Sequence, residues 1–231
     1  MGVFSKVARD YRAVRQNDPA IPKGLRGVAE ILFCTPGFLS VAAHRGIHFL
    51  HTRCRIPVLP RFLSLVVRWW TGIEIHPGAV LEAGVFIDHG SGVVIGESAV
   101  VGENSVIYQG VTLGATGNET TWKRHPTIGA HVVIGSGAKI LGPISIGDHS
   151  KVGAGSIVLD SIPPNSTVVG RKAEIVRVNG EKVKRDIGQD AISYEQILFR
   201  MQRLEKQLEQ LGGQLKNKDA ETKEEEYDYA I

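Results

Sequence analysis

Two histidines in this chain stand beside charged residues in a pattern suited to acid–base chemistry. His89 follows an aspartate, and His125 follows an arginine. Histidine is the side chain best placed to accept a proton near neutral pH, and a carboxylate that holds one ring nitrogen leaves the other free as a base. Three carboxylates are candidates for that supporting role: Glu74, Asp88 and Glu97. Each histidine alone is also compatible with an ordinary surface turn, so its place in the fold matters.

A six-residue repeat is the framework that must position these histidines. An aliphatic residue recurs at every sixth position in two runs, namely Ile95, Val101, Ile107 and Leu113, then Ile128, Ile134, Ile140, Ile146, Val152 and Val158. A short fixed period is typical of a solenoid, in which each turn buries its face only against the next. Six residues suit one side of a three-sided coil. We therefore predict a coil over residues 73–172, with about 18 residues per turn and turns roughly 4.8 Å apart.

The repeat fails at two places, and each failure carries one of the histidines. The step after Ile87 is eight residues long instead of six, so two extra residues lie near His89. After Leu113 the period is lost, and the segment ATGNETTWKRHPT, which includes His125, must loop out of the coil. Two histidines at the only irregularities of the coil favour a functional site over two unrelated surface turns.

The flanking segments lack this repeat and divide the chain further. Residues 1–72 form a small helical region, with candidate helices at 26–34, 38–53 and 61–70. Residues 173–188 form a short hairpin or linker around an Asn-Gly turn. Apolar residues at steps of three and four in 189–211 predict either an amphipathic helix lying on its own subunit or a short trimeric coiled coil. Residues 212–231 read as a flexible acidic tail.

Composition limits the function classes. The formal net charge is +3 with mixed signs along the chain, which argues against a nucleic-acid partner. Two cysteines give no disulfide framework, and the first 16 residues have no apolar run of the kind found in a signal peptide. The apolar stretch 28–50 is too interrupted by polar residues to cross a bilayer. We therefore expect a cytoplasmic protein with no membrane partner.

Six segments carry a specific resemblance: IEIHPGAVL, FIDHGSGVVIGES, YQGVTLGATG, KRHPTIG, VVIGSGAKILGPISIG and VGAGSIVL. In this order they resemble the serine acetyltransferases of cysteine biosynthesis, over about residues 17–173. The resemblance implies a mixed fold, in which a left-handed parallel β-helix follows the helical region and precedes the C-terminal helix. It also implies a homotrimer with active sites between subunits. Longer members join two trimers through a larger helical domain that this chain lacks, so we expect a trimer and not a hexamer.

The resemblance assigns the catalytic roles. His89 matches the general base that takes the proton of the serine hydroxyl as it attacks the thioester of acetyl-CoA, and His125 matches the second essential histidine. Glu74 matches the carboxylate behind the base, where longer members have Asp. Two other departures from the family pattern, Ala115 in LGATG and the coil exit GRKAE, fall on the acetyl-CoA side.

The resemblance also assigns the binding roles. Asp18 and Asp88 match the groups that hold the serine ammonium, and Arg124 matches the group that binds its carboxylate. Small residues and cations along the coil match the site of acetyl-CoA, the co-substrate: Gly114, Ala138, Lys139, Ala154, Gly155 and Arg171. No metal is expected. Family members end in Ile, which enters the active site of O-acetylserine sulfhydrylase, so Ile231 is the expected contact with that partner.

Three other interpretations remain open at this stage. His131 and His149 are 18 residues apart, so they should stack on adjacent turns of one face. Together with His89 and His125 they invite comparison with the three-histidine zinc site of γ-carbonic anhydrases. Against zinc, His125 lies in the looped-out segment, out of register. Hexapeptide acetyltransferases that act on sugars typically use one histidine. A third alternative is a non-catalytic trimeric scaffold for the sulfhydrylase. The spacing of His44, His48 and His51 on one helix face is explained by half-buried packing histidines.

Overall fold

A computed structural model describes residues 2–170, 174–182 and 203. The chain forms two compact units, Met1–Val183 and Lys184–Ile231, and the fold below is that of the first unit. Four predicted features lie outside the described residues: the helix 189–211 apart from Arg203, the tail 212–231, Arg171 and Ile231.

Four helices precede the coil: α1 (Val3–Asn17), α2 (Leu25–Cys34), α3 (Pro36–Thr52) and α4 (Leu59–Thr71). The last three agree with the predicted helices to within two residues at each end. We did not predict α1 as a separate helix, because its buried side consists of only Asp10, Ala13 and Val14. No single described helix is long and apolar enough to span a membrane. The pair α2 and α3 passes that test only together, with a bend of 67° between them.

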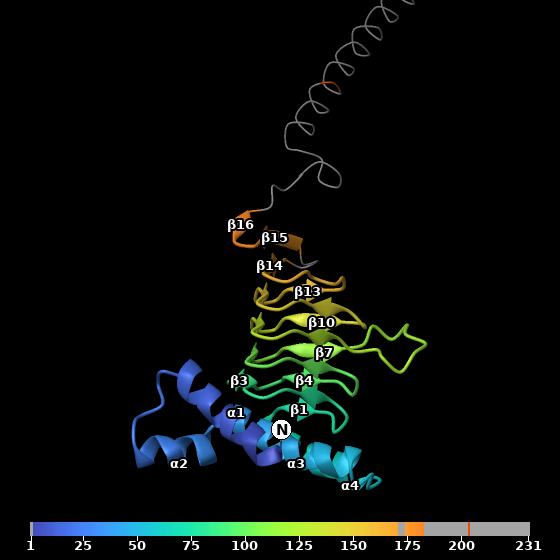
Figure 1. The fold of residues 1–231 in the computed structure, drawn as a ribbon. Coiled ribbons are helices and arrows are strands. Elements are labelled where there is room, and N and C mark those ends of the chain that lie inside the picture. The colour runs from blue at the N-terminus through green and yellow to red at the C-terminus, as the bar shows by residue number, and fades with distance from the viewer. Residues whose placement is uncertain (1, 171–173, 183–202, 204–231) are drawn as a thin grey trace, which may run out of the picture. The chain divides into compact units, whose positions relative to one another are not determined.

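The coil has three sides, each a stack of parallel strands (Figure 1). Sheet A contains β1 (Glu74–Ile75), β4 (Val94–Ile95), β7 (Thr112–Gly114), β10 (Lys139–Leu141) and β13 (Ile157–Val158). Sheet B contains β2 (Val80–Leu81), β5 (Val100–Val101), β8 (Thr127–Ile128) and β11 (Ser145–Ile146). Sheet C contains β3 (Phe86–Asp88), β6 (Val106–Tyr108), β9 (Val133–Ile134), β12 (Lys151–Val152) and β14 (Ser166–Val169), and then a hairpin. The predicted parallel β-helix is confirmed.

The core of the coil consists of the repeat positions. Each of them is at most 5% exposed: Ile75, Leu81, Ile87, Ile95, Val101, Ile107, Leu113, Ile128, Ile134, Ile140, Ile146, Val152 and Val158. Glycines often follow them because successive turns come very close. At Gly135, for example, an added Cβ would lie 2.6 Å from the backbone nitrogen of Ala154. The six-residue period is therefore a packing requirement that the structure confirms.

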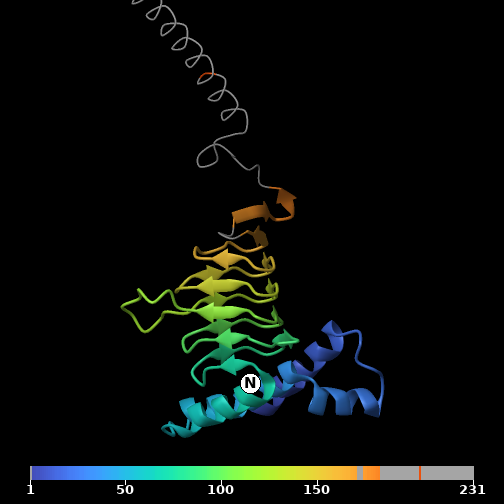
Figure 2. The same cartoon turned by 180° about the vertical axis from the view of Figure 1, so that it is seen from behind.

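Both predicted breaks of the repeat are present, and they lie at different corners of the coil. The long step after Ile87 is the turn from β3 to β4, at residues 89–93, which we call the C/A corner because it joins sheet C to sheet A. The looped-out segment 115–126 leaves the coil between β7 and β8, at the A/B corner, and projects from the stack (Figures 1 and 2).

The coil ends in the predicted hairpin. Strands β15 (Glu174–Val178) and β16 (Glu181–Lys182) pair antiparallel, and β15 also pairs antiparallel with β14. The two turn residues have positive φ, 52° at Asn179 and 82° at Gly180, as the type I′ turn of an Asn-Gly hairpin requires. This change of direction interrupts the parallel stacking at the end of the described coil.

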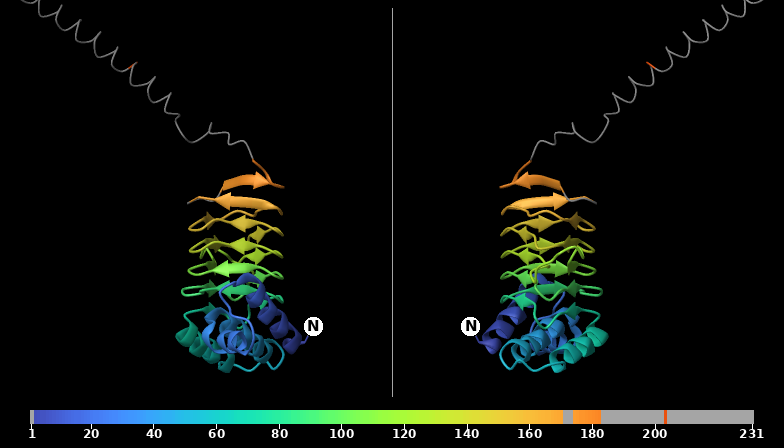
Figure 3. Two further views of the ribbon diagram at one scale, coloured as in Figure 1. Left: turned by 90° about the vertical axis from the view of Figure 1, so that its left-hand side faces the viewer. Right: turned by 90° about the vertical axis from the view of Figure 1, so that its right-hand side faces the viewer.

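The helices gather at the first turns of the coil (Figure 3). One attachment is apolar: Val14 of α1 and Phe38 of α3 belong to the same buried cluster as Phe86 of β3. The other is the buried ion pair between Asp10 of α1 and Arg45 of α3, whose side chains are 1% and 5% exposed. Arg45 also donates to the coil carbonyls of Leu81 and Glu82, so this pair connects both helices to the turn after β2.

Candidate active site

His125 lies at the end of the looped-out segment and is held against the coil. Its ring is only 8% exposed. Ser98, in the turn between β4 and β5, contacts Nδ1 through its backbone N–H at 3.2 Å and through Oγ at 2.9 Å. The ring packs on Gly96, where an added Cβ would collide with the imidazole. The A/B corner therefore holds this histidine in one orientation.

The environment of His125 favours its neutral form. Burial lowers the pKa of the imidazole, and the neighbouring Arg124 guanidinium lowers that pKa further. Arg124 is exposed and pairs with Glu97 at 3.1 Å, across the same corner. The Nζ of Lys123 donates to the Ser98 carbonyl at 2.6 Å, which fastens the end of the loop to the coil. The result is a neutral imidazole beside a solvent-facing guanidinium.

His89 lies at the C/A corner, directly after the last residue of β3. It is exposed, and its φ of 57° lies in the left-handed region, where histidine is found more often than most residues. The backbone N–H of Gly90 donates to the Asp88 carbonyl at 2.6 Å, which closes a tight turn around the histidine. The Asp88 side chain is partly buried beside it. The two extra residues of this turn thus present His89 outward from the coil.

One chain does not bring the two histidines together. Strand β4 runs from the C/A corner to the A/B corner, so the width of sheet A separates His89 from Ser98 and from the His125 that Ser98 holds. A site that uses both histidines on one substrate would need a second copy of the chain to bring the opposite corner nearby.

The predicted carboxylates occupy different surroundings. Both carboxylate oxygens of Glu74 pair with arginines of α4, at 3.1 Å from Arg61 and 2.7 Å from Arg68. Asp18 follows the last residue of α1 and accepts a hydrogen bond from the backbone N–H of Ala20 at 2.9 Å. Glu74 therefore has competing cationic partners, which the sequence did not lead us to expect.

The residues expected to bind acetyl-CoA lie on successive turns of the coil. Gly114 of β7 pairs with Leu141 of β10, the strand that begins at Lys139. Ala138 precedes this strand and is 0% exposed in the coil core, so the prediction that its side chain contacts acetyl-CoA is wrong. The backbone N–H of Lys139 donates to the Ser156 carbonyl at 2.8 Å, one turn further on, directly after the exposed Ala154 and Gly155. This row along the coil suits an elongated ligand.

Comparison with known proteins identifies the family. A family profile of bacterial transferase hexapeptides matches residues 125–160, and one of the succinyl-transferase hexapeptide repeat matches residues 92–115. The chain is 47% identical to a serine acetyltransferase of Synechococcus elongatus over 91% of its own length and 86% of the relative's. A serine acetyltransferase of Bacillus subtilis is 43% identical, over 93% and 96%. The chain belongs to the serine acetyltransferase family.

Solved structures of serine acetyltransferases share the fold. The soybean enzyme in complex with serine has a TM-score of 0.71 and 43% identity, covering 76% of this chain and 70% of that one. The Brucella abortus enzyme in complex with coenzyme A has a TM-score of 0.70 and 40% identity, covering 75% and 67%. These likenesses extend beyond the coil, because the coil alone is less than half of the chain.

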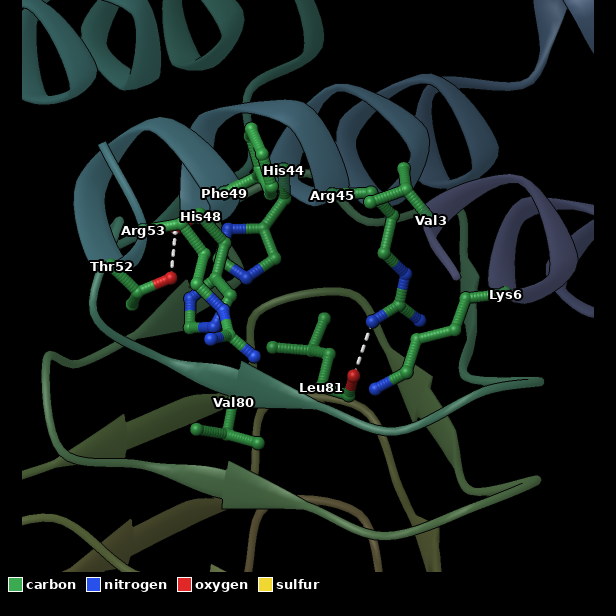
Figure 4. A pocket seen from close by; sticks show the side chains of 10 residues that line it. All are labelled: Val3, Lys6, His44, Arg45, His48, Phe49, Thr52, Arg53, Val80 and Leu81. Atoms are coloured by element: carbon green, nitrogen blue, oxygen red, sulfur yellow. Dashed lines mark hydrogen bonds between the residues drawn. The ribbon is translucent and has the colours of Figure 1, made fainter. Parts of the chain in front are cut away.

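Four other histidines make their contacts elsewhere in the structure: His44, His48, His131 and His149. His44 and His48 line a cavity of about 230 Å³ between α1, α3 and β2 (Figure 4). His44 Nε2 lies 3.1 Å from the Ala79 carbonyl, and His48 Nδ1 lies 2.8 Å from the Pro77 carbonyl, so both rings tie α3 to the coil. The rings of His131 and His149 stack with centroids 4.9 Å apart. In the described part of the chain, no group of three or more His, Cys, Asp or Glu residues could hold a metal ion.

Ser98 is the contact of His125 that the sequence reasoning missed. The register of the six-residue repeat could have predicted this contact. Strands β5 and β8 pair with Val100 beside Thr127, an offset of 27 residues that combines one coil turn with the looped-out insertion. The same offset places Ser98 beside His125.

Proposed function

We propose that the protein is a serine O-acetyltransferase, which transfers the acetyl group of acetyl-CoA to L-serine to give O-acetyl-L-serine for cysteine biosynthesis. The observation that carries the proposal is the placement of Asp88 and His89 at one break of the coil and Arg124 and His125 at the other. The rest of the coil is a packed repeat. The 47% identity to a serine acetyltransferase covers both breaks.

In the proposed reaction His89 acts as general base. Its imidazole takes the proton of the serine hydroxyl as the oxygen attacks the thioester carbonyl carbon, which forms a tetrahedral intermediate. The C–S bond then breaks, the carbonyl re-forms, and the thiolate of CoA receives the proton from the His89 imidazolium. The exposed position of His89 on a tight turn supports this role, because the ring is accessible to a substrate.

Serine is a zwitterion, so its orientation requires a cation and at least one anion. We assign its carboxylate to Arg124, whose guanidinium is exposed at the A/B corner and, within the described part of the chain, pairs with Glu97. We assign its ammonium to Asp88, which precedes the base, and to Asp18, which follows α1. Glu74 is the proposed support of His89, and that role requires it to release at least one of its two arginines.

The active site would form between subunits of a homotrimer. His89 and Arg124 belong to different corners of one chain, and the proposed threefold assembly would bring the C/A corner of one subunit to the A/B corner of the next. The test is subunit mixing. His89→Ala and His125→Ala proteins should each be inactive, while random co-assembly should restore about a quarter of the sites. If mixed subunits stay inactive, the intersubunit site is wrong.

Acetyl-CoA would lie along the coil with its thioester near His89. The row from Gly114 through Lys139 to Gly155 supports this placement, because it follows the coil axis over successive turns. The ammonium of Lys139 is a candidate for a phosphate. Arg171 is proposed for the adenine end on sequence grounds alone. A metal has no role in this mechanism.

The decisive measurement is CoA release from acetyl-CoA, with L-serine and with sugars as alternative acceptors. Release that depends on L-serine supports the proposal. Folded protein that releases no CoA with serine would leave the scaffold alternative, and release with a sugar would favour another acetyltransferase. His89→Ala should lower turnover by about 10²- to 10⁴-fold, as expected when a general base is lost, while light scattering still finds the trimer.

Two further proposals concern the setting of the enzyme. O-acetylserine sulfhydrylase is the proposed partner, bound through Ile231, and a pull-down with and without this residue tests it, since equal capture would exclude that contact. We place the protein in the cytoplasm. Support comes from its two cysteines, Cys34 and Cys54, which are free and exposed, as a reducing compartment allows.

A further inference from the structure

Ser98 occupies the centre of the A/B corner without belonging to the expected catalytic set. It lies in the turn between β4 and β5 and is 3% exposed. Its Oγ accepts the backbone N–H groups of Arg124 and His125, both at 3.1 Å. Its carbonyl accepts Lys123 Nζ at 2.6 Å. One serine therefore holds three consecutive residues of the looped-out segment, which includes both proposed functional groups of that loop.

The same serine determines which nitrogen of His125 carries the proton. The backbone N–H of Ser98 always has its hydrogen, and it points at Nδ1 from 3.2 Å. Nδ1 must therefore be the unprotonated, accepting nitrogen, and the neutral ring must carry its hydrogen on Nε2. The hydroxyl agrees with this assignment. Its oxygen already accepts two N–H groups, so its own hydrogen is directed to Nδ1 at 2.9 Å.

We propose that Ser98 is a positioning residue of the reaction, which holds His125 as the Nε2–H tautomer and so makes it a hydrogen-bond donor to a substrate oxygen. This inference rests on the proposed function. Among the described residues, His125 Nε2 has no hydrogen-bond partner, so its N–H is available to a ligand. The two histidines then have different tasks: His89 accepts a proton, and His125 donates a hydrogen bond.

The charge state of His125 supports this division. Protonation at Nδ1 would set the new N–H against the Ser98 N–H, and burial and Arg124 already lower the pKa of the ring. A neutral Nε2–H group donates a hydrogen bond without giving up its proton at neutral pH. Such a donor stabilises negative charge that develops on an oxygen in the transition state.

Ser105 provides a matched control on the same coil. It is 0% exposed, its Oγ donates to the Gly129 carbonyl at 2.9 Å, and it accepts the backbone N–H of Val132 at 3.1 Å. Like Ser98 it connects residues 27 positions apart across one coil turn. Unlike Ser98, its hydrogen bonds within the described residues are to backbone groups alone. Removing its hydroxyl therefore reproduces the structural cost of losing a buried serine without disturbing a histidine.

The direct test is the tautomer itself. In protein labelled with ¹⁵N-histidine, long-range proton–nitrogen correlation at neutral pH should find His125 with a protonated Nε2 and an unprotonated Nδ1, with the signals assigned through their loss in His125→Gln. A protonated Nδ1, or an average of the two tautomers, would overturn the proposal. This measurement needs no turnover, so it is independent of whether serine is the acceptor.

The kinetic test compares three serine variants. Ser98→Ala should lower kcat at saturating serine by up to about 100-fold, because the donor is misplaced in the transition state. The KM for serine should rise as well, because Ser98 also holds the backbone of Arg124. Ser98→Thr keeps the hydroxyl and should recover most of kcat, and Ser105→Ala should leave kcat unchanged. Equal kcat in Ser98→Ala and Ser105→Ala would overturn the proposal. If Ser98→Ala does not fold, Ser98→Thr overturns the proposal instead when its tautomer is altered and its kcat is unchanged.

A second pair of variants tests whether His125 acts as a hydrogen-bond donor or as a base. The amide of His125→Gln can place an N–H near the position of Nε2, whereas the shorter His125→Asn can reach only the position of Nδ1. The proposal expects more residual kcat in His125→Gln. Equal loss in both variants would overturn the donor role. If the wild-type protein releases no CoA in response to serine, the proposed function is contradicted instead, and the tautomer measurement remains valid.

Discussion

Removal of Asp10 should destabilise the helical region much more than removal of a neighbouring surface charge. Arg45 holds Asp10 with Nε and Nη2, both at 3.1 Å, and Asp10 also accepts the backbone N–H of Gly84 at 2.8 Å. Asp10→Ala leaves a guanidinium buried among coil carbonyls with no counter-charge. Breaking a buried ion pair in this way costs about 3–5 kcal/mol. For a chain of this size that corresponds to a fall in Tm of about 6–20 °C.

The same α1 helix offers a control. Lys6 pairs with Glu82 at 2.9 Å, but the two side chains are 23% and 40% exposed. A surface pair of this kind is worth at most about 1 kcal/mol, so Glu82→Ala should lower Tm by only a few degrees. Both variants are measured by thermal denaturation at one protein concentration, because oligomerisation stabilises the folded state by mass action.

Asp10→Ala should also affect the reaction through Asp18. Both residues belong to the α1 segment, and a loosened α1 no longer fixes the proposed contact with the serine ammonium. We expect the KM for serine to rise while the KM for acetyl-CoA stays constant. The reasoning is refuted if Asp10→Ala is no less stable than Glu82→Ala. A double variant, Asp10→Leu with Arg45→Met, should recover much of the lost stability, because it leaves no buried charge unpaired.

Three further predictions test other parts of the structure. Gly96→Ala should remove most of the activity at a modest stability cost of about 1–3 kcal/mol. The reason is that its Cβ would lie 2.8 Å from His125 Cγ and must displace the ring. A folded variant that shows cooperative thermal unfolding and keeps the wild-type kcat would contradict this. Burial lowers the pKa of His44 to about 3, so as the pH falls the unfolded chain takes up this proton before the folded chain does. The neutral His44 therefore contributes its full stabilisation above pH 6.5, and this stabilisation is lost progressively as the pH falls from 6.5 towards 3. Acidification from pH 6.5 to 5 should cost about 2 kcal/mol in the wild type and less in His44→Gln, measured by denaturant unfolding. Metal analysis of purified protein should find no stoichiometric zinc, and chelator should leave turnover unchanged.

The coil was predictable because its period is a packing rule. Each inward residue must lie above its equivalent one turn earlier, so an aliphatic residue at every sixth position defines three sides and the register of every strand. The same logic located both insertions, since an extra residue inside a turn would expose an apolar position. The Asn-Gly hairpin was equally predictable, because the residue types Asn179 and Gly180 favour the two positive φ angles that its turn requires.

Contacts between separate elements were not predictable in the same way. The pairing of Glu74 with Arg61 and Arg68 depends on how α4 lies against β1, and no spacing along the chain encodes that. The buried Asp10 inside α1 weakened the apolar pattern of that helix, and its compensating charge on α3 is 35 residues away in sequence. Ser98 differs from these cases, because the coil register does encode its contact with His125.

In the proposed mechanism the two corners of the coil have separate tasks, and this separation can be tested by mixing variant subunits. The proposed base His89 and Asp88 belong to the C/A corner, whereas Ser98, Arg124 and His125 are connected at the A/B corner. If the site forms between subunits, a damaged A/B corner can be replaced by the intact A/B corner of the next subunit. Mixed trimers of Ser98→Ala with His89→Ala should therefore regain sites, while Ser98→Ala with His125→Ala should not, because both lesions damage the same corner. Recovery only in the mixture with His125→Ala would place Ser98 on the side of the base, and recovery in neither mixture would show that Ser98→Ala damages the fold of the whole subunit.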